Sequence, residues 1–413
     1  MKKWFIAFIG LLVHLLLGTV YAWSYFQTPI VTSTNWSNVQ VAWAFSISIF
    51  MLGISAAWAG LKLSKYGPRK LAMLGGVLYA SGYLLSSLAL SIKSIGLLYI
   101  GFGIFGGIGL GLAYVTPVAT VAKWFSKHQG LATGMVVMGF GFGALVMSKV
   151  LAPLLMFAHH NSLEKTFLFI GIIFLILLPV FSWFLEDPSS TRENIPNIKK
   201  TQVLEIILSR PFMILWAMFL INITAGMVFI GFQSALLQDL LKVGLPKETN
   251  LNAEDIQLYL MTSGATLIAV SSVFNGIGRF FWATLSDKLG RITTFRILLL
   301  LQVFVFASLL YVTNPLLFSI LICVILLCYG GGFGLIPTVI KDQYGEELMP
   351  VLYGSILTAW SLGGILGPQL VAYMKDNYSE QAGLIVYSVS GSLLLIGWML
   401  SFFFKYKISQ PNG

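Results

Sequence analysis

The stretch Asn275-Gly-Ile-Gly-Arg279-Phe-Phe-Trp-Ala-Thr-Leu-Ser-Asp287-Lys-Leu-Gly-Arg291 closes an apolar segment, residues 256–284, that is long enough to cross a membrane as a helix. The loop that follows is predicted to begin at about Ser286, which places Arg279 roughly 10 Å inside that end of the helix. A cation at this depth is costly unless it faces a partner or a water-filled cavity. We therefore predict that Arg279 belongs to a functional site.

Asn275 lies one helical turn before Arg279, on the same face of the predicted helix. The two side chains offer a positive charge and an amide, and a guanidinium holds a carboxylate with two parallel hydrogen bonds. The pair therefore suits a small carboxylate anion. An asparagine in a membrane helix can instead bond a neighbouring helix, and that interpretation stays open.

Composition identifies the environment of the chain. Of its 413 residues, 57% are hydrophobic and 10% are charged, and the mean hydropathy is +0.86. Soluble proteins carry about 25% charged residues, and no polar stretch here is long enough for a soluble domain. Cys323 and Cys328 share one apolar segment and offer neither a disulfide framework nor metal-ligand spacing. We expect an integral membrane protein with no metal and no cofactor.

The sequence contains twelve apolar segments of about 20 residues, the length of a membrane-spanning helix. Their approximate bounds are 4–26, 40–61, 71–91, 96–119, 129–152, 166–185, 211–238, 256–284, 293–313, 315–339, 350–373 and 382–404. The most polar stretch follows the sixth segment. We predict an all-α integral membrane fold of two six-helix bundles, residues 1–185 and 210–413, joined by a cytoplasmic linker, residues 186–209.

Lysine and arginine gather in alternate loops. The chain ends and the loops after even-numbered segments hold eighteen, the opposite loops hold five, and Lys149 and Arg279 lie inside segments, which accounts for all 25. Cytoplasmic loops carry this excess in membrane proteins. We therefore expect a multi-pass protein of the cell inner or cytoplasmic membrane with both termini cytoplasmic, in contact with membrane lipid and not with nucleic acid.

The two halves repeat one loop sequence. Gly60-Leu-Lys-Leu-Ser64-Lys65-Tyr-Gly67-Pro-Arg69 follows the second segment, and Ala283-Thr-Leu-Ser-Asp287-Lys288-Leu-Gly290-Arg291 follows the eighth, with lysine and glycine at a constant offset of 223 residues. The fourth, tenth, fifth and eleventh segments are predicted to end at Pro117, Pro337, Pro153 and Pro368. Parallel six-helix repeats build one class of transporter.

These loops resemble the G-x-x-x-D-x-x-G-R signature of the major facilitator superfamily. Three stretches are further similar to the oxalate/formate antiporters and the bacterial monocarboxylate (lactate) transporters: Tyr21-Ala-Trp-Ser, Lys123-Trp-Phe-Ser-Lys-His-Gln-Gly-Leu-Ala-Thr-Gly134 and Arg279 to Arg291. The resemblance covers essentially the whole chain. It implies conformational gating by the two loops, with the gating residues Gly60, Ser64, Arg69, Asp287, Gly290 and Arg291.

The resemblance also implies a carboxylate site lined by aromatic side chains. The residues at the matching positions are Tyr21, Tyr114, Tyr329 and Phe333, with Trp360 as a further wall. A tyrosine supplies an apolar wall and one hydroxyl donor. Because aromatic residues make up 14% of the chain, packing or an interfacial belt is the alternative interpretation for any single one.

Three departures from these families bear on the substrate and its coupling. Ser64 replaces the aspartate of the signature, so the first loop is a weakened copy. Trp360 stands where oxalate/formate exchangers carry a second buried lysine, so a dicarboxylate would leave one charge unmatched. Mammalian-type monocarboxylate transporters have aspartate at the Asn275 position, and the amide removes one candidate proton carrier. The lone cation favours a monocarboxylate.

A coupling proton has few candidate carriers. All fifteen acidic residues fall in loops or at segment ends. His14 lies roughly 15 Å into the first segment and is the candidate proton-coupling side chain, although a histidine buried for packing is the more common case. Alternatively, the proton travels with the substrate carboxylate beside Arg279. Lys149 is predicted to snorkel to the membrane interface.

We expect a secondary active transporter of small monocarboxylates of the lactate or pyruvate type, working as a monomer by alternating access in symport with a proton. An anion exchanger of the oxalate/formate type is the alternative within transport. A transporter-like nutrient receptor is the alternative of another class. We expect no enzyme and no catalytic residue, because the sequence contains no nucleophile–base or metal-ligand constellation.

Overall fold

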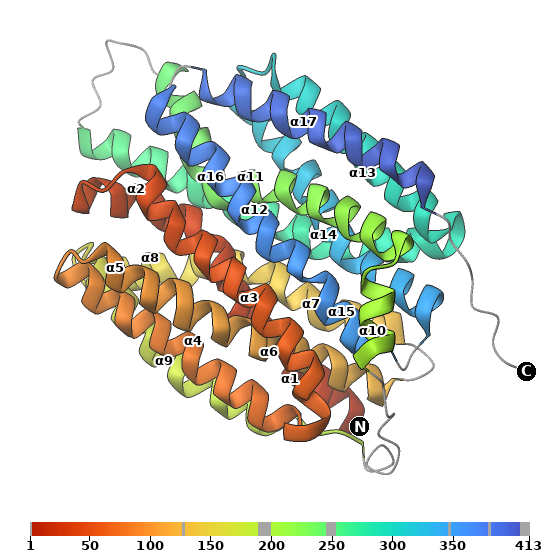
Figure 1. Cartoon of the computed structure of the whole chain (residues 1–413). Coiled ribbons are helices and arrows are strands. Elements are labelled where there is room, and N and C mark those ends of the chain that lie inside the picture. Colours follow the sequence, from red (N-terminus) through yellow and green to blue (C-terminus); the bar gives the residue numbers. More distant parts are fainter. Residues whose placement is uncertain are drawn as a thin grey trace, which may run out of the picture.

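The computed structural model of the chain is built of helices (Figure 1). It describes residues 2–125, 129–188, 200–244, 253–345, 348–378 and 381–404, and within these ranges no residue lies in a β-strand. Twelve helical spans in these ranges are long and apolar enough to cross a membrane. The twelve predicted segments and the all-α fold are therefore confirmed.

The first half of the chain contains six spans. The first consists of α1 (Lys2–Leu17), the 3-10 turn η1 (Gly18–Ala22) and α2 (Trp23–Thr34). The other five are α3 (Asn38–Tyr66), α4 (Pro68–Ser91), the run of α5 (Ile95–Leu98), η2 (Tyr99–Gly106) and α6 (Gly107–Trp124), the run of α7 (Gln129–Val146), η3 (Met147–Leu151) and α8 (Ala152–Ala158), and α9 (Leu163–Trp183).

The second half begins with a short helix, α10 (Lys200–Ile207), and continues with six spans. These are α11 (Arg210–Gly244), α12 (Ala253–Leu289), α13 (Arg291–Leu309), α14 (Pro315–Tyr344), the pair α15 (Met349–Ile356) and α16 (Thr358–Asn377), and α17 (Ala382–Leu400) with η5 (Ser401–Phe403).

The helices form two six-helix bundles, red to yellow and green to blue in Figure 1. Two seams carry most of the contacts between the bundles: α3 packs against α15 and α16, and α7 packs against α12. In addition, α2 packs against α11. A Cβ atom added to Gly53 would collide with Ser361, and one added to Gly141 would collide with Gly276. Small residues allow membrane helices to approach this closely. Both seams are therefore closed in this structure.

The helix ends define two faces of the molecule. We call the face where α1 begins the N-terminal face, and the opposite one, with the turns at Asn35 and Asn314, the distal face. On the N-terminal face the chain turns at Gly67 with φ +75° and at Gly290 with φ +86°, a region that glycine enters without steric cost. The offset of 223 residues between these glycines therefore reflects the same turn, built twice.

Several predicted boundaries are wrong. α12 continues through Ser286 to Leu289, so Arg279 lies deeper than predicted, roughly 15 Å from that helix end. The prolines predicted to end four segments lie within the spans that they were expected to close: Pro117 in α6, Pro337 in α14, Pro368 in α16 and Pro153 in the first turn of α8. Neighbouring helices and local adjustments satisfy the freed backbone groups in membrane proteins.

The predicted linker, residues 186–209, contains the helix α10. This helix was not predicted, because the linker sequence shows no hydrophobic periodicity. Residues 189–199 of the linker, residues 126–128 of the Lys123–Gly134 stretch, Met1 and residues 405–413 lie outside the described ranges.

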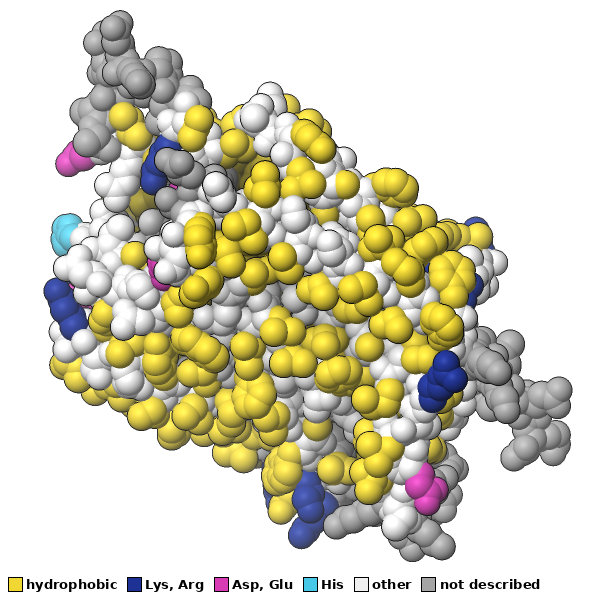
Figure 2. All heavy atoms as spheres, turned by 45° about the horizontal axis from the view of Figure 1, so that its top comes forward, with side chains coloured by type: hydrophobic (Ala, Val, Ile, Leu, Met, Phe, Trp, Pro, Cys, Tyr) yellow, Lys and Arg dark blue, Asp and Glu magenta, His cyan; other side chains and the backbone are white. Residues whose placement is uncertain are grey.

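The surface agrees with a membrane environment. Hydrophobic side chains cover the broad face in Figure 2, whereas lysine, arginine and acidic side chains appear towards its margins. Phenylalanine and tryptophan side chains along this surface are partly exposed, among them Phe169, Phe304 and Trp58. Exposed apolar area of this extent is expected where lipid is the solvent.

Candidate functional site

Arg279 lies at the centre of the molecule, between the two bundles. Its side chain is fully buried, and none of its three guanidinium nitrogens has a hydrogen-bond partner among the described residues. The Cζ atom lies 4.8 Å from the ring centroid of Phe333 and 5.6 Å from that of Phe140. Arg279 and His14 are the fully buried basic side chains of the described ranges. A buried cation without a counter-ion costs several kcal/mol.

Six aromatic side chains pack around this guanidinium, and we call them the aromatic cage. They come from η1, α6, α7, α14 and α16: Tyr21, Tyr114, Phe140, Tyr329, Phe333 and Trp360. Trp360 contacts four of the other five rings, with ring centroids 4.7 Å from Phe333 and 5.2 Å from Tyr114. The structure therefore brings together the five aromatic residues that the sequence singled out, and adds Phe140.

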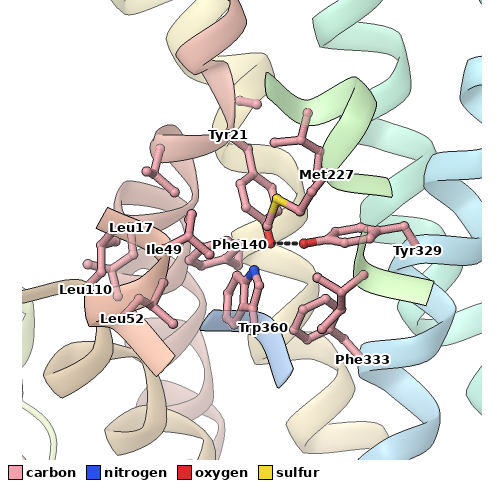
Figure 3. Close-up of a cluster of buried hydrophobic side chains, with 14 of the residues drawn as sticks. Leu17, Tyr21, Ile49, Leu52, Leu110, Phe140, Met227, Tyr329, Phe333 and Trp360 are labelled. Carbon is pink, nitrogen blue, oxygen red and sulfur yellow. Dashed lines mark hydrogen bonds between the residues drawn. The ribbon is translucent and has the colours of Figure 1, made fainter. Parts of the chain in front are cut away.

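A hydrogen bond crosses the cage from one bundle to the other. The hydroxyls of Tyr21 and Tyr329 are 2.5 Å apart, and the indole nitrogen of Trp360 points toward them (Figure 3). Tyr21 follows Gly18, where an added Cβ would collide with the Phe140 carbonyl. This close contact and the 3-10 turn η1 fix the position of Tyr21 in the middle of the first span.

Tyr114 supplies a free hydroxyl to the cage. This group has no hydrogen-bond partner among the described residues, and the same holds for the hydroxyl of Tyr353 on α15. Both tyrosines lie within electrostatic range of Arg279, as do Tyr21 and Tyr329. Sequence reasoning missed Phe140 and Tyr353. The signal for Phe140 was the alternating Gly139-Phe-Gly-Phe-Gly143 in the fifth apolar segment.

His14 packs against the cage from α1. Its ring centroid lies 5.0 Å from that of Tyr114, and its Nδ1 atom lies 3.1 Å from the carbonyl oxygen of Gly10, one turn earlier on the same helix. Nε2 has no hydrogen-bond partner in the described structure. The histidine is therefore beside the cage, and only one of its two ring nitrogens is bonded.

Asn275 lies one turn from Arg279 on α12, on the side of the cage that faces the distal end of the molecule. Its side chain is buried and packs against the backbone of Gly330, and its Oδ1 atom lacks a hydrogen-bond partner among the described residues. The predicted shared face of Asn275 and Arg279 is thus present, and Asn275 is not used to bond a neighbouring helix through Oδ1.

Lys149 lies at the seam between the bundles. It is on η3, and its Nζ atom donates a 2.6 Å hydrogen bond to the Thr266 hydroxyl on α12. The side chain is exposed, and its bond joins the two bundles. The interfacial position of Lys149 stays a prediction.

The two predicted gating loops differ in their bonding. Arg291 forms an ion pair with Asp287, and its Nε donates a 3.0 Å hydrogen bond to Asp342 at the end of α14. In the first loop Gly60 and Ser64 lie on α3, with Ser64 exposed, and the Arg69 guanidinium lies 4.8 Å from the ring centroid of Trp183. In the second loop, the ionic contacts of Arg291 therefore connect α12, α13 and α14. In the first loop, the contact of the Arg69 guanidinium with the Trp183 ring connects α4 and α9.

The site can bind a small anion. It offers one guanidinium with its donors free, tyrosine hydroxyls and apolar ring faces, and no group of three or more potential metal ligands occurs in the part of the chain that the structure describes. A carboxylate would neutralise the charge and accept two parallel hydrogen bonds from the fork. Within the described ranges no other lysine or arginine is buried, so a second carboxylate would find no second cation.

Twelve membrane spans in two bundles around one central site define a multi-pass membrane transporter fold. The Major Facilitator Superfamily model matches residues 4–368 of the chain, so the chain belongs to that superfamily. Its similarity to the crystal structure of a D-xylose–proton symporter has a TM-score of 0.72 at 15% identity, covering 99% of this chain and 100% of that one, and this likeness shows the fold alone.

Two curated relatives cover most of the chain. It is 23% identical to the oxalate:formate antiporter of Oxalobacter formigenes over 416 residues, 99% of this chain and 93% of the relative. It is 25% identical to monocarboxylate transporter 13 of Rattus norvegicus over 389 residues, 93% of this chain and 84% of the relative. Both relatives are named for small carboxylate anions, as the resemblance in the sequence implied.

Proposed function

We propose that this transporter carries small monocarboxylates of the lactate or pyruvate type across the membrane together with a proton. The observation that supports the substrate class is the single unpaired guanidinium of Arg279 inside an apolar aromatic cage. One carboxylate matches one buried cation. A dicarboxylate would bring a second charge against Trp360 and Phe333, where nothing offsets its desolvation.

In the proposed complex the carboxylate lies against Arg279, and hydroxyls of the cage orient it. Tyr21 and Tyr329 come from different bundles, so an anion bound between them would contact both. Binding would remove the cost of the buried charge and so favour closure of the bundles around an occupied site. Alternating access would then open the seams on one face at a time.

The charge distribution supports an orientation for this transporter in the membrane. The N-terminal face carries most of the lysine and arginine, so it is the cytoplasmic face, and both termini are cytoplasmic. The two bundles enclose the whole proposed site, so a monomer suffices. We propose the cell inner or cytoplasmic membrane as its setting.

Exchange of one anion for another is the second candidate. The specific observation in its favour is that the bundles close around Arg279 although its guanidinium has no counter-ion among the described residues. The neighbouring Asn275 is neutral and does not offset this charge. A carrier returning without an anion would have to pass through this costly arrangement, whereas a carrier loaded in both directions would not. The oxalate:formate antiporter among the relatives is named for this mode.

Uptake by the purified protein in proteoliposomes distinguishes these modes. Labelled lactate, and in a parallel experiment labelled pyruvate, is offered with an inward proton gradient, with and without the same unlabelled acid inside the vesicles. Symport predicts accumulation in vesicles without internal lactate, and a protonophore abolishes it. Exchange predicts uptake only when the vesicles are preloaded. No protein-dependent movement of lactate or pyruvate under either condition would refute the proposed function.

A further inference from the structure

A polar pocket lies next to the aromatic cage on its distal side. Tyr21, Gln233, Ser271, Ser272 and Asn275 supply its polar lining, and apolar side chains of α7, α11, α12 and α14 complete it. Each of these five polar residues is at most 3% exposed. The pocket thus belongs to the interior of the protein and not to its lipid-facing surface.

The internal bonding of the pocket fixes the direction of its polar groups. The Ser271 hydroxyl has two acceptors within reach, Oε1 of Gln233 at 2.8 Å and the Ile268 carbonyl oxygen at 3.1 Å. The shorter bond, to Gln233, leaves the Gln233 amide nitrogen as the donor of that side chain. The Ser272 hydroxyl donates to the Gly141 carbonyl on the other bundle. Oδ1 of Asn275 has no partner among the described residues. The pocket therefore presents one acceptor without a partner, Oδ1 of Asn275, and one donor, the amide nitrogen of Gln233.

The position of the pocket relative to Arg279 is set by α12 and by Tyr21. Asn275 is one turn from Arg279, a rise of about 6 Å along the helix, and Tyr21 lines the pocket while its ring belongs to the cage. The Tyr21–Tyr329 hydrogen bond lies at the boundary between them. A ligand of a few atoms bound at Arg279 can therefore place a neighbouring polar atom toward the pocket.

The pocket suits a hydroxyl group better than an ion. In the closed structure it has room for about one water-sized group. Its oxygens are neutral, and the nearby guanidinium repels a cation. A hydroxyl both donates and accepts, so it could donate to Asn275 and accept from the Gln233 amide. A methylene group in the same place would leave both amides unpaired, which a buried site strongly disfavours.

We propose that the polar pocket binds the 2-hydroxyl group of a short 2-hydroxy monocarboxylate whose carboxylate is held at Arg279. This inference rests on the proposed function and narrows it, because the chain then selects hydroxy acids over acids of the same length without the hydroxyl. Gln233 and Asn275 contact the hydroxyl. Ser271 is a positioning residue that orients the Gln233 amide.

The test compares uptake of lactate and propionate, which differ by this hydroxyl. The wild-type protein is expected to prefer lactate at least about tenfold. Gln233→Met, which keeps the approximate size of the side chain, is expected to lower the lactate-to-propionate ratio about three- to tenfold, the effect of one hydrogen bond. Ser271→Ala is expected to change the ratio in the same direction, with propionate uptake retained in both variants.

The chain offers matched controls on α11: Ser234 is the residue next to Gln233, and Gln238 lies between one and two turns further along the helix. Gln238 and Ser234 are also buried and bond each other at 3.0 Å, yet neither lines the pocket. Gln238→Met and Ser234→Ala are expected to keep the wild-type ratio. An unchanged ratio in a folded Gln233→Met protein, or an equal change in Gln238→Met, overturns the hydroxyl subsite and leaves the proposed function intact. No wild-type transport of lactate, propionate or pyruvate overturns both.

Discussion

Replacing Arg279 with lysine separates the geometry of the site from its charge. The planar guanidinium lies over Phe333 and near Phe140, at 4.8 Å and 5.6 Å from the ring centroids, with its donors free. Lysine keeps the charge but has no fork and does not stack as a planar group. Losing one of two charge-assisted hydrogen bonds costs about 1.5–3 kcal/mol, so uptake of lactate is expected to fall at least about tenfold.

The assay is initial-rate uptake into proteoliposomes at equal amounts of folded protein. Arg296→Lys is the matched control, because Arg296 also stacks on a ring, Phe402 at 4.4 Å, but bonds to Ser401 at the end of the last span. The control is expected to transport at about the wild-type rate. Wild-type rates in Arg279→Lys, or in a well-folded Arg279→Ala protein, would show that this side chain does not bind substrate.

Three further substitutions test the cage and the proton. Trp360→Lys is expected to shift competition from lactate toward oxalate, since it adds the second cation that a dianion needs; unchanged competition in folded protein would mean that this position does not face the anion. Tyr329→Phe breaks the hydrogen bond to Tyr21 and is expected to slow uptake about three- to tenfold, with Tyr387→Phe on α17 as the control. Equal uptake rates for the two variants would show that this hydrogen bond does not contribute to transport. His14→Gln is expected to retain both counterflow and proton-driven accumulation, because one ring nitrogen already bonds its own helix at Gly10. Loss of accumulation alone would assign the coupling proton to His14.

The sequence predicted the fold well because membrane spans carry a strong local signal. About twenty apolar residues in a row leave few alternatives to a helix, and the glycine of each repeated loop marked a turn. Prolines misled the prediction, since Pro117 and Pro337 would end a helix in water but lie inside spans here. The extent of α12 beyond Ser286 was missed because its last turn is polar.

The central cation of the site was also predictable, because burying Arg279 in a membrane span is costly and the cost implies a role. The aromatic residues of the cage were predicted from the resemblance to the transporter families. Their spacing alone does not distinguish a side chain that lines the site from one that only packs in the core. Neither Phe140 nor Gln233 was found in this way, because the alternating glycines around Phe140 flank Phe142 equally. Their roles depend on which faces of α7 and α11 meet the other bundle, and this is a property of tertiary packing, not of local sequence.

Equilibrium binding to the purified protein tests the central claim most directly, without the complications of coupling or direction. Labelled lactate is titrated into wild-type protein and into Arg279→Gln in detergent, with thermal melts to confirm that both are folded. The account predicts saturable binding at one site per chain in the wild type and its loss in the variant. Equal affinity in the two proteins would contradict the claim that the buried guanidinium holds the anion.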